Sequence, residues 1–90
     1  MAPEARADLF RLNAFLARRS PDAARRAMDA IDAALRSLTH MPFRARRILG
    51  DLHEFDIRFG KSGYVVQFRV DHLAVIIARV FHMREDRSSA

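Results

Sequence analysis

The sequence feature that most constrains the fold is the stretch of residues 52–82, where three segments in succession have the spacing of β-strands. Residues 52–59 and 64–70 alternate apolar with polar side chains, which is the period expected for a strand with one face in solvent. Residues 73–82 form an almost unbroken apolar run rich in β-branched side chains, typical of a strand in the middle of a sheet. Short polar or glycine-containing turns separate the segments. The sequence therefore predicts a three-stranded antiparallel meander.

The register of the second hairpin decides which side chains share a face of this sheet. We take Asp71-His72 as a two-residue turn, so that directly opposed residues share a face. The core face then contains the pairs Val66–Ile77, Phe68–Val75 and Val70–Leu73. The opposite face carries Val65, Gln67, Arg69, Ala74, Ile76, Ala78, Val80 and His82. That face is apolar at its centre, and exposed apolar area of this kind usually contacts a partner.

Two helices are predicted ahead of the sheet, at residues 3–19 and 21–38. Ser20 is a good N-cap for the second helix and Pro21 suits its first position, and the short connection predicts an antiparallel helical hairpin. Each helix has one apolar stripe at helical spacing. The stripe of the first helix is Leu9, Leu12 and Leu16, and that of the second is Ala24, Met28, Ile31, Leu35 and Leu38.

Length and composition indicate one globular domain over residues 1–90, because half of the residues are hydrophobic and the chain is too short for two cores. The absence of cysteine excludes a disulfide framework and a thiolate metal site. No apolar run has the length of a membrane span, and the N-terminus lacks a secretory signal. We expect a soluble cytoplasmic protein that does not bind membranes.

The chain is basic, with 16 Lys and Arg against 11 Asp and Glu and a formal net charge of +5. Such a balance fits a nucleic acid, a ribosome or an acidic protein as partner. Pro42 ends the second helix, and residues 39–51 are predicted to form a basic loop. Arg44, Arg46 and Arg47 lie within four positions there, so this loop is a candidate contact for phosphate or for an acidic protein. A solvated loop without a partner is the alternative. Residues 83–90 are predicted to form a polar tail.

The order of these elements resembles the ParE and RelE superfamily of bacterial toxins, with an α+β fold in which a helical hairpin packs on a C-terminal antiparallel meander. The resemblance covers nearly the whole chain and rests on four stretches: Ala5 to Leu16 with its Asp8-Leu9, Ser20-Pro21 before the second helix, the segment Phe59-Gly60-Lys61-Ser62-Gly63-Tyr64-Val65-Val66, and the closing segment from Ile77 to Asp86, which contains Val80-Phe81-His82-Met83-Arg84. It implies the toxin of a type II toxin-antitoxin system, a ParE-like plasmid stabilisation protein. A cognate antitoxin, expected to be ParD-like, would neutralise it through an acidic C-terminal segment.

The sequence departs from this family at its start. Members usually begin with a strand before the first helix, and Met1-Ala2-Pro3 leaves no residues to form one. Either the start codon is misplaced, or the protein is truncated, or the sheet has one more open edge.

Within the superfamily, the resemblance implies two modes of action: ParE-like members poison DNA gyrase, and RelE-like members cut messenger RNA on the ribosome. A nuclease needs groups that activate the 2′-hydroxyl, stabilise the developing charge and protonate the leaving oxygen. The candidates in this chain are His82, Arg84, Arg79, Arg69, Lys61 and Glu54. RelE-like sequences tend to carry an arginine at the position of Val65, which is apolar here. The comparison favours a protein-binding toxin that acts on gyrase, with the mRNA interferase as the alternative.

The remaining expectations concern partners. The antitoxin is expected on the open sheet face, at Val65, Gln67, Arg69, Ile76, Ala78 and Val80. No cofactor is expected, and the scattered His40, His53 and His72 do not form a metal set. We expect no direct DNA binding outside the toxin-antitoxin complex, and a homodimer or a hetero-oligomer with the antitoxin is possible. A non-toxic basic nucleic-acid-binding module ranks last, because the phenylalanines fall on expected core faces and not among exposed arginines.

Overall fold

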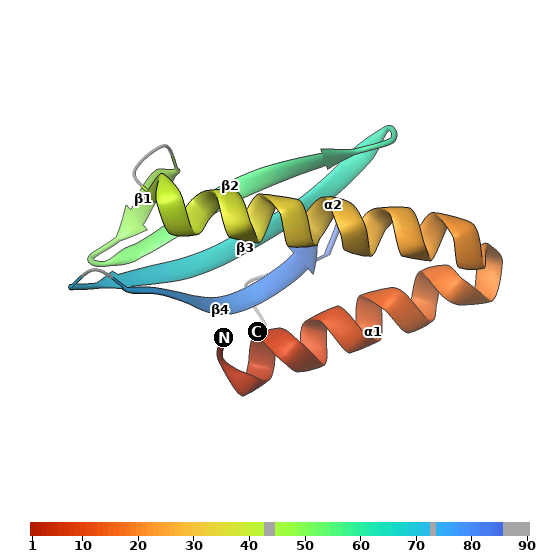
Figure 1. Ribbon diagram of the computed structural model, residues 1–90, viewed down its shortest axis with the longest axis horizontal. Helices are drawn as coiled ribbons and strands as arrows, with labels where there is room; N and C mark the ends of the chain where they lie inside the picture. Colours follow the sequence, from red (N-terminus) through yellow and green to blue (C-terminus); the bar gives the residue numbers. More distant parts are fainter. Residues whose placement is uncertain (43–44, 73, 86–90) are drawn as a thin grey trace.

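The computed structural model describes residues 1–42, 45–72 and 74–85 and has an α+β fold, as the sequence predicted. Two helices precede four strands, which form one antiparallel sheet in the order β1-β2-β3-β4 (Figure 1). The elements are α1 (Pro3–Arg19), α2 (Pro21–His40), β1 (Arg46–Leu49), β2 (Leu52–Phe59), β3 (Ser62–Asp71) and β4 (Ala74–His82).

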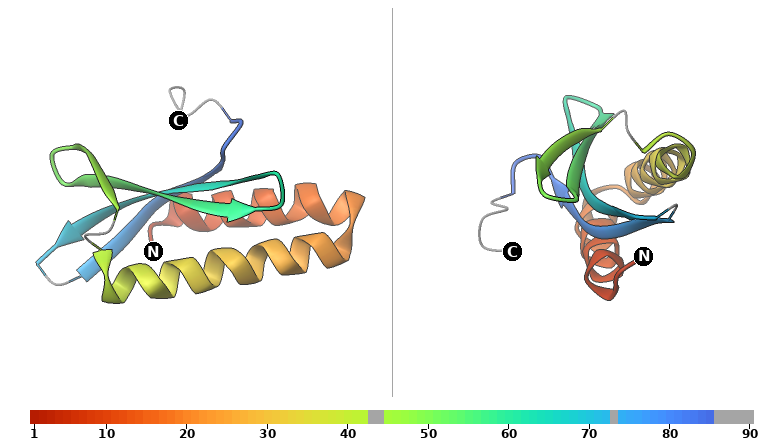
Figure 2. Two further views of the ribbon diagram at one scale, coloured as in Figure 1. Left: turned by 90° about the horizontal axis from the view of Figure 1, so that it is seen from above. Right: turned by 90° about the vertical axis from the view of Figure 1, so that its left-hand side faces the viewer.

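The helical hairpin forms as the sequence predicted. The Ser20 Oγ accepts a hydrogen bond from the Ala23 backbone N–H at 3.1 Å, and Pro21 takes the first helical position of α2. The helix ends at His40, shortly before Pro42. In Figure 2, α2 lies across one face of the sheet and α1 runs beside β4.

The hydrophobic core lies between α2 and the sheet. Its most deeply buried side chains come from the two helices and from strands β3 and β4, at 0 or 1 % exposure: Ala5, Ala27, Ile31, Leu38, Val66, Phe68 and Val80. Each large apolar side chain buried in this way stabilises the fold by about 1.5–3 kcal/mol. The predicted stripe of α2 therefore does face the core.

The prediction of a three-stranded sheet with a basic loop at residues 39–51 was wrong for part of that loop. Residues 46–49 form the edge strand β1, in which Arg46 pairs with Glu54 and Leu49 with Leu52. A tight turn follows it, and Gly50 adopts a positive φ of 56° there, a conformation that glycine adopts without steric cost. All four residues of β1 are exposed, so the strand has no buried face to impose an alternating pattern on the sequence.

The predicted register of the second hairpin was also wrong. Val70 pairs with Val75 and Phe68 with Ile77, and then a β-bulge leaves Ala78 without a partner on β3, so that Val66 pairs with Val80. Leu73, the predicted partner of Val70, lies outside the described residues. The bulge inserts one residue into β4 and turns Val80 to the helix side of the sheet, because successive side chains of a strand alternate between faces.

The outer edge of β4 forms hydrogen bonds with the N-terminal end of the chain and with α1. The Ala2 N–H donates a hydrogen bond to the Ile77 carbonyl at 2.8 Å. The Val80 N–H donates to Oδ2 of Asp8 at 2.9 Å. Unpaired strand edges invite pairing with other chains, and in the described residues these contacts satisfy two of the backbone groups at this edge.

Candidate functional site

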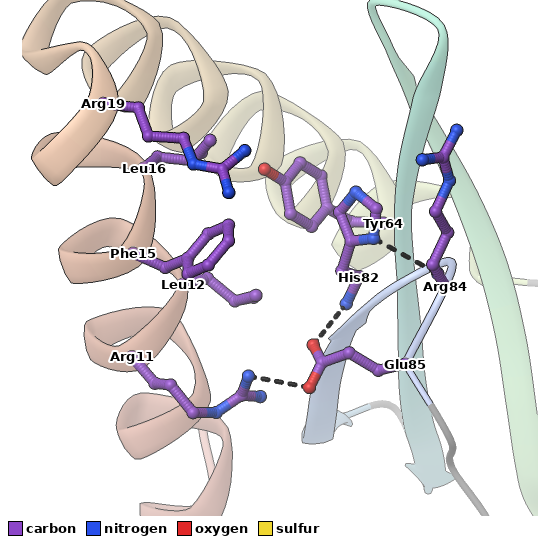
Figure 3. A pocket seen from close by; sticks show the side chains of 9 residues that line it. All are labelled: Arg11, Leu12, Phe15, Leu16, Arg19, Tyr64, His82, Arg84 and Glu85. Carbon is purple, nitrogen blue, oxygen red and sulfur yellow. Dashed lines mark hydrogen bonds and ion pairs between the residues drawn. The ribbon is translucent and has the colours of Figure 1, made fainter.

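A pocket of about 620 Å³ opens between α1 and the part of the sheet where β3 begins and β4 ends (Figure 3). Its lining combines apolar side chains with cations. The lining residues are Arg11, Leu12, Phe15, Leu16, Arg19, Tyr64, His82, Arg84 and Glu85. Of these, the sequence had singled out only His82 and Arg84 as functional candidates.

His82 stands at the end of β4 with its ring in the pocket. Its Nδ1 accepts a hydrogen bond from the Arg84 backbone N–H at 3.2 Å, which assigns the proton of the neutral ring to Nε2. The ring meets Tyr64 edge-on, with the centroids 5.5 Å apart. Burial raises the pKa of the Tyr64 phenol, so this hydroxyl is protonated at neutral pH.

Glu85 connects the end of the sheet to α1. One of its carboxylate oxygens accepts from the His82 backbone N–H at 2.8 Å, and the other lies 2.7 Å from the Arg11 guanidinium (Figure 3). Arg19 lies with its guanidinium 4.9 Å from the centroid of the Phe15 ring. Within the described residues, Arg19 and Arg84 form no ion pair.

A row of polar side chains crosses the opposite face of the sheet, from β1 to β3. Arg46 lies 3.0 Å from the Glu54 carboxylate, and Gln67 donates to the other oxygen of Glu54 at 2.8 Å. A second bond joins Arg46 to Asp56 at 3.0 Å, and hydrogen bonding to Asp56 raises the pKa of the Arg46 guanidinium. The sequence predicted that this face is apolar at its centre, but the polar row crosses it beside the buried apolar pair Val65 and Phe81.

Arg79 continues the row on β4 and reaches over the sheet edge to α1. It donates two hydrogen bonds to the Asp8 carboxylate, at 2.7 and 2.9 Å. Burial alone would raise the pKa of Asp8, but the hydrogen bonds from Arg79 and from the Val80 N–H outweigh it and lower that pKa. Asp8 is 3 % exposed, so this carboxylate is a buried anchor between α1 and β4.

The residues predicted for antitoxin binding do not form one apolar surface. Val80 belongs to the core and is turned away from the open face, because of the bulge at Ala78. Val65 is 2 % exposed, although it belongs to that face. Gln67 is held by Glu54, as described above.

The other members of the predicted set are more accessible. Ile76 is 39 % exposed, and Arg69 forms an exposed ion pair with Asp51 at 2.5 Å. Arg44 of the predicted basic contact lies outside the described residues. Arg47, from the same set, is exposed and donates to the Gly50 carbonyl at 2.6 Å.

The six nuclease candidates do not converge. His82 and Arg84 line the pocket, whereas Glu54, Arg69 and Arg79 belong to the face that carries the polar row. Lys61 is exposed in the turn between β2 and β3. In residues 1–42, 45–72 and 74–85, no three His, Asp or Glu side chains are grouped so that they could hold a metal ion.

Comparison with known proteins assigns the family. A family model described as the ParE toxin of the type II toxin-antitoxin system parDE matches residues 1–87. The chain belongs to this ParE toxin family. The family membership confirms the resemblance read from the sequence and identifies the chain as the toxin of a type II toxin-antitoxin system, which implies a cognate antitoxin.

Two relatives of this ParE-family toxin come from Caulobacter vibrioides. Toxin RelE3 is 40% identical over 87 residues, which cover 97% of this chain and 95% of the relative. Toxin RelE1 is 39% identical over 83 residues, which cover 92% of this chain and 89% of the relative. The family model carries the ParE name and these relatives carry the RelE name, so the names do not separate the two modes of action. Among the described helices of the toxin, none is long and apolar enough to cross a membrane.

Proposed function

We propose that this toxin acts in the cytoplasm by binding a protein target, with DNA gyrase as that target, and that a ParD-like antitoxin neutralises it. The observation that carries the proposal is the separation of the candidate catalytic groups on two faces of the sheet. General acid-base catalysis requires donors and acceptors within about 2.6–3.2 Å of the same reacting atoms. Groups on opposite faces of a sheet cannot meet that requirement.

Two of the candidate catalytic charges on the polar face are also neutralised within the chain. Arg79 is held by the buried Asp8, and Glu54 by Arg46 and Gln67. Using Arg79 on a phosphate would break two hydrogen bonds and leave a buried carboxylate without its cation, which is costly. These residues therefore support the fold and the association of α1 with β4 rather than a reaction.

The mRNA interferase remains the second candidate function, because one pocket brings together His82, Tyr64 and Arg84. A histidine, a phenol and an arginine are groups that could move a proton and stabilise a phosphate. The RelE names of the two relatives point in the same direction.

A single substitution distinguishes the two functions. We expect purified wild-type toxin and His82→Ala to inhibit gyrase supercoiling equally, within about threefold, and neither to create new messenger RNA ends when expressed without antitoxin. A suitable control is His72→Asn, because His72 is exposed in a turn with a φ of 54° and asparagine tolerates that conformation. Two results together would refute gyrase poisoning. The wild type would leave supercoiling unaffected, and it would cleave ribosome-bound messenger RNA at a rate that falls about 10²- to 10⁴-fold in His82→Ala.

A further inference from the structure

A second apolar stripe, the outer stripe, runs along α1. Its members repeat at spacings of 4, 3, 4 and 3 residues, which places them on one side of a helix. They are Pro3, Ala7, Phe10, Ala14 and Ala17, all exposed or half-buried. Phe10 at the centre is 79 % exposed, more than any other large apolar side chain in the described residues.

The outer stripe faces away from the rest of the fold. The buried residues of α1 are Ala5, Asp8 and Leu12, and at 3.6 residues per turn they lie on the opposite side of the helix. In Figure 1, α1 borders the molecule, with α2 and the sheet on one side of it. Exposed apolar side chains that are grouped in this way mark an interaction surface.

The charges beside the outer stripe have opposite signs at the two ends of α1. Glu4 and Arg18 are 14 residues apart, almost a whole number of turns, so they lie on the same flank of the stripe. Neither forms an ion pair with a described residue. Arg11 lies between them, but it is paired with both Asp8 at 3.4 Å and Glu85 at 2.7 Å. The free charges on this flank are therefore an acid at the start and a base at the end.

A second copy of α1 that runs antiparallel complements this pattern. A two-fold axis at the middle of the stripe places Phe10 against Ala14 of the other copy, and Ala7 against Ala17. Alanines at these positions let the two helix axes approach to about 8 Å, so that the aromatic ring is buried between them. The antiparallel arrangement also opposes the two helix dipoles favourably.

The charges select the same arrangement. The two-fold axis brings each Glu4 beside Arg18 of the other copy, whereas parallel helices would place equal charges together. On the other flank, the central residue is the exposed and uncharged Asn13, so its two copies do not repel each other. An acidic peptide or a nucleic acid would be repelled by Glu4 at one end of the stripe, which makes a second copy of the chain the better fit.

We infer that the outer stripe is a surface for self-association, through which two toxin molecules pack their α1 helices antiparallel about a two-fold axis. A contact between two single helices is smaller than the standard interface of about 1,600 Å². We therefore expect a weak dimer, with a Kd of about 10–200 µM. The inference does not depend on the identity of the cellular target.

Sedimentation velocity of the purified toxin, over about 5–500 µM, measures the association directly. Phe10→Ser should raise the Kd about tenfold or more, because it removes the aromatic side chain at the centre of the contact. The matched control is Phe15→Ser, which removes the same side chain from the pocket side of the same helix, where Phe15 is 54 % exposed. This control should leave the Kd within about twofold of the wild type, since the stripe is intact.

A pair of charge reversals tests the antiparallel arrangement. Glu4→Arg alone and Arg18→Glu alone each place like charges together at both ends of the dimer, and each should raise the Kd about three- to tenfold. An equimolar mixture of the two variants restores opposite charges at both ends, so the mixed dimer should form with a Kd within about twofold of the wild type. Each protein carries the same substitution alone and in the mixture, so any effect on its own folding cancels in this comparison.

Three results would overturn the inference. The first is a wild type that stays monomeric over the whole concentration range. The second is a Phe15→Ser variant that loses association as much as Phe10→Ser does, and the third is a mixture of the charge variants that associates no better than either variant alone. If the wild type is monomeric and Phe10→Ser weakens binding to the cognate antitoxin instead, the outer stripe is an antitoxin contact.

Discussion

Replacing Asp8 by alanine should be one of the most destabilising single changes outside the core. The carboxylate accepts two hydrogen bonds from Arg79 and one from the Val80 N–H, and it is 3 % exposed. A hydrogen bond to a charged group contributes about 1.5–3 kcal/mol, and a buried N–H left without an acceptor costs about 1–3 kcal/mol. Arg79 is partly exposed and can regain water, which offsets some of the loss. We therefore expect a loss of about 2–4 kcal/mol in the free energy of unfolding.

The assay is urea unfolding followed by circular dichroism, combined with a double-mutant cycle of Asp8→Asn and Arg79→Gln. A loss of this size is a large fraction of the roughly 5–15 kcal/mol available to a small domain. The cycle should give a coupling energy above about 1 kcal/mol. A coupling below about 0.5 kcal/mol, or an unchanged urea midpoint for Asp8→Ala, would show that the ion pair does not hold α1 to β4.

The same carboxylate predicts a dependence of stability on pH. Its pKa is lowered in the folded protein, so its contribution is fully present above the unfolded-state pKa of about 3.9 and is lost as the pH falls through the lower folded value. Wild-type protein should therefore lose more stability below about pH 4 than Asp8→Asn does. Equal slopes of unfolding free energy against pH for the two proteins would contradict this.

Two further predictions test the core and the register of the sheet. Ile31→Ala should lower the free energy of unfolding by about 3–5 kcal/mol, and Leu35→Ala, at a half-buried position of the same stripe, should lower it by about 2–3 kcal/mol. If urea unfolds the Leu35→Ala variant at a lower concentration than the Ile31→Ala variant, α2 is rotated about its axis. Val80→Asp should abolish folding because it places a charge in the core, whereas Ile76→Asp on the open face should shift the melting temperature by only a few degrees. If the Val80→Asp variant folds, Val80 does not face the core, and the register predicted without the bulge would be the correct one.

The sequence was informative where one physical requirement dominates a segment. The stripe of α2 is such a case, because a helix with one buried side must repeat apolar residues at its own period. The cap at Ser20 is another, since its hydroxyl satisfies a backbone donor that the helix leaves free. In β2, Phe55, Ile57 and Phe59 also face the core as their alternation predicts, and these elements sufficed to suggest the family.

Features that depend on contacts between distant segments were missed. Strand β1 lies at the sheet edge with all its residues exposed, so its sequence is subject to no burial pattern. The bulge at Ala78 changes the face of Val80 without changing the composition of the strand. The pocket was missed because its lining residues are distant in the sequence, with Arg11 and Tyr64 more than 50 positions apart.

One signal in the sequence did point to the anchor of α1. Asp8 lies between Ala5 and Leu12 on the side of α1 that is otherwise apolar. A charged residue on a stripe that must be buried needs a partner of opposite charge. That position alone could have indicated an ion pair with a distant basic residue, although not which one.

The contact between Asp8 and β4 also determines when this protein can finish folding. Its two ends are 71 and 72 residues apart in the chain, so α1 is synthesised long before its partner strand. At about 5–20 residues per second, this interval lasts roughly 4–15 s. During that time the carboxylate of Asp8 remains hydrated and α1 has no strand against which to pack. The toxin therefore completes its fold only after nearly the whole chain has been translated.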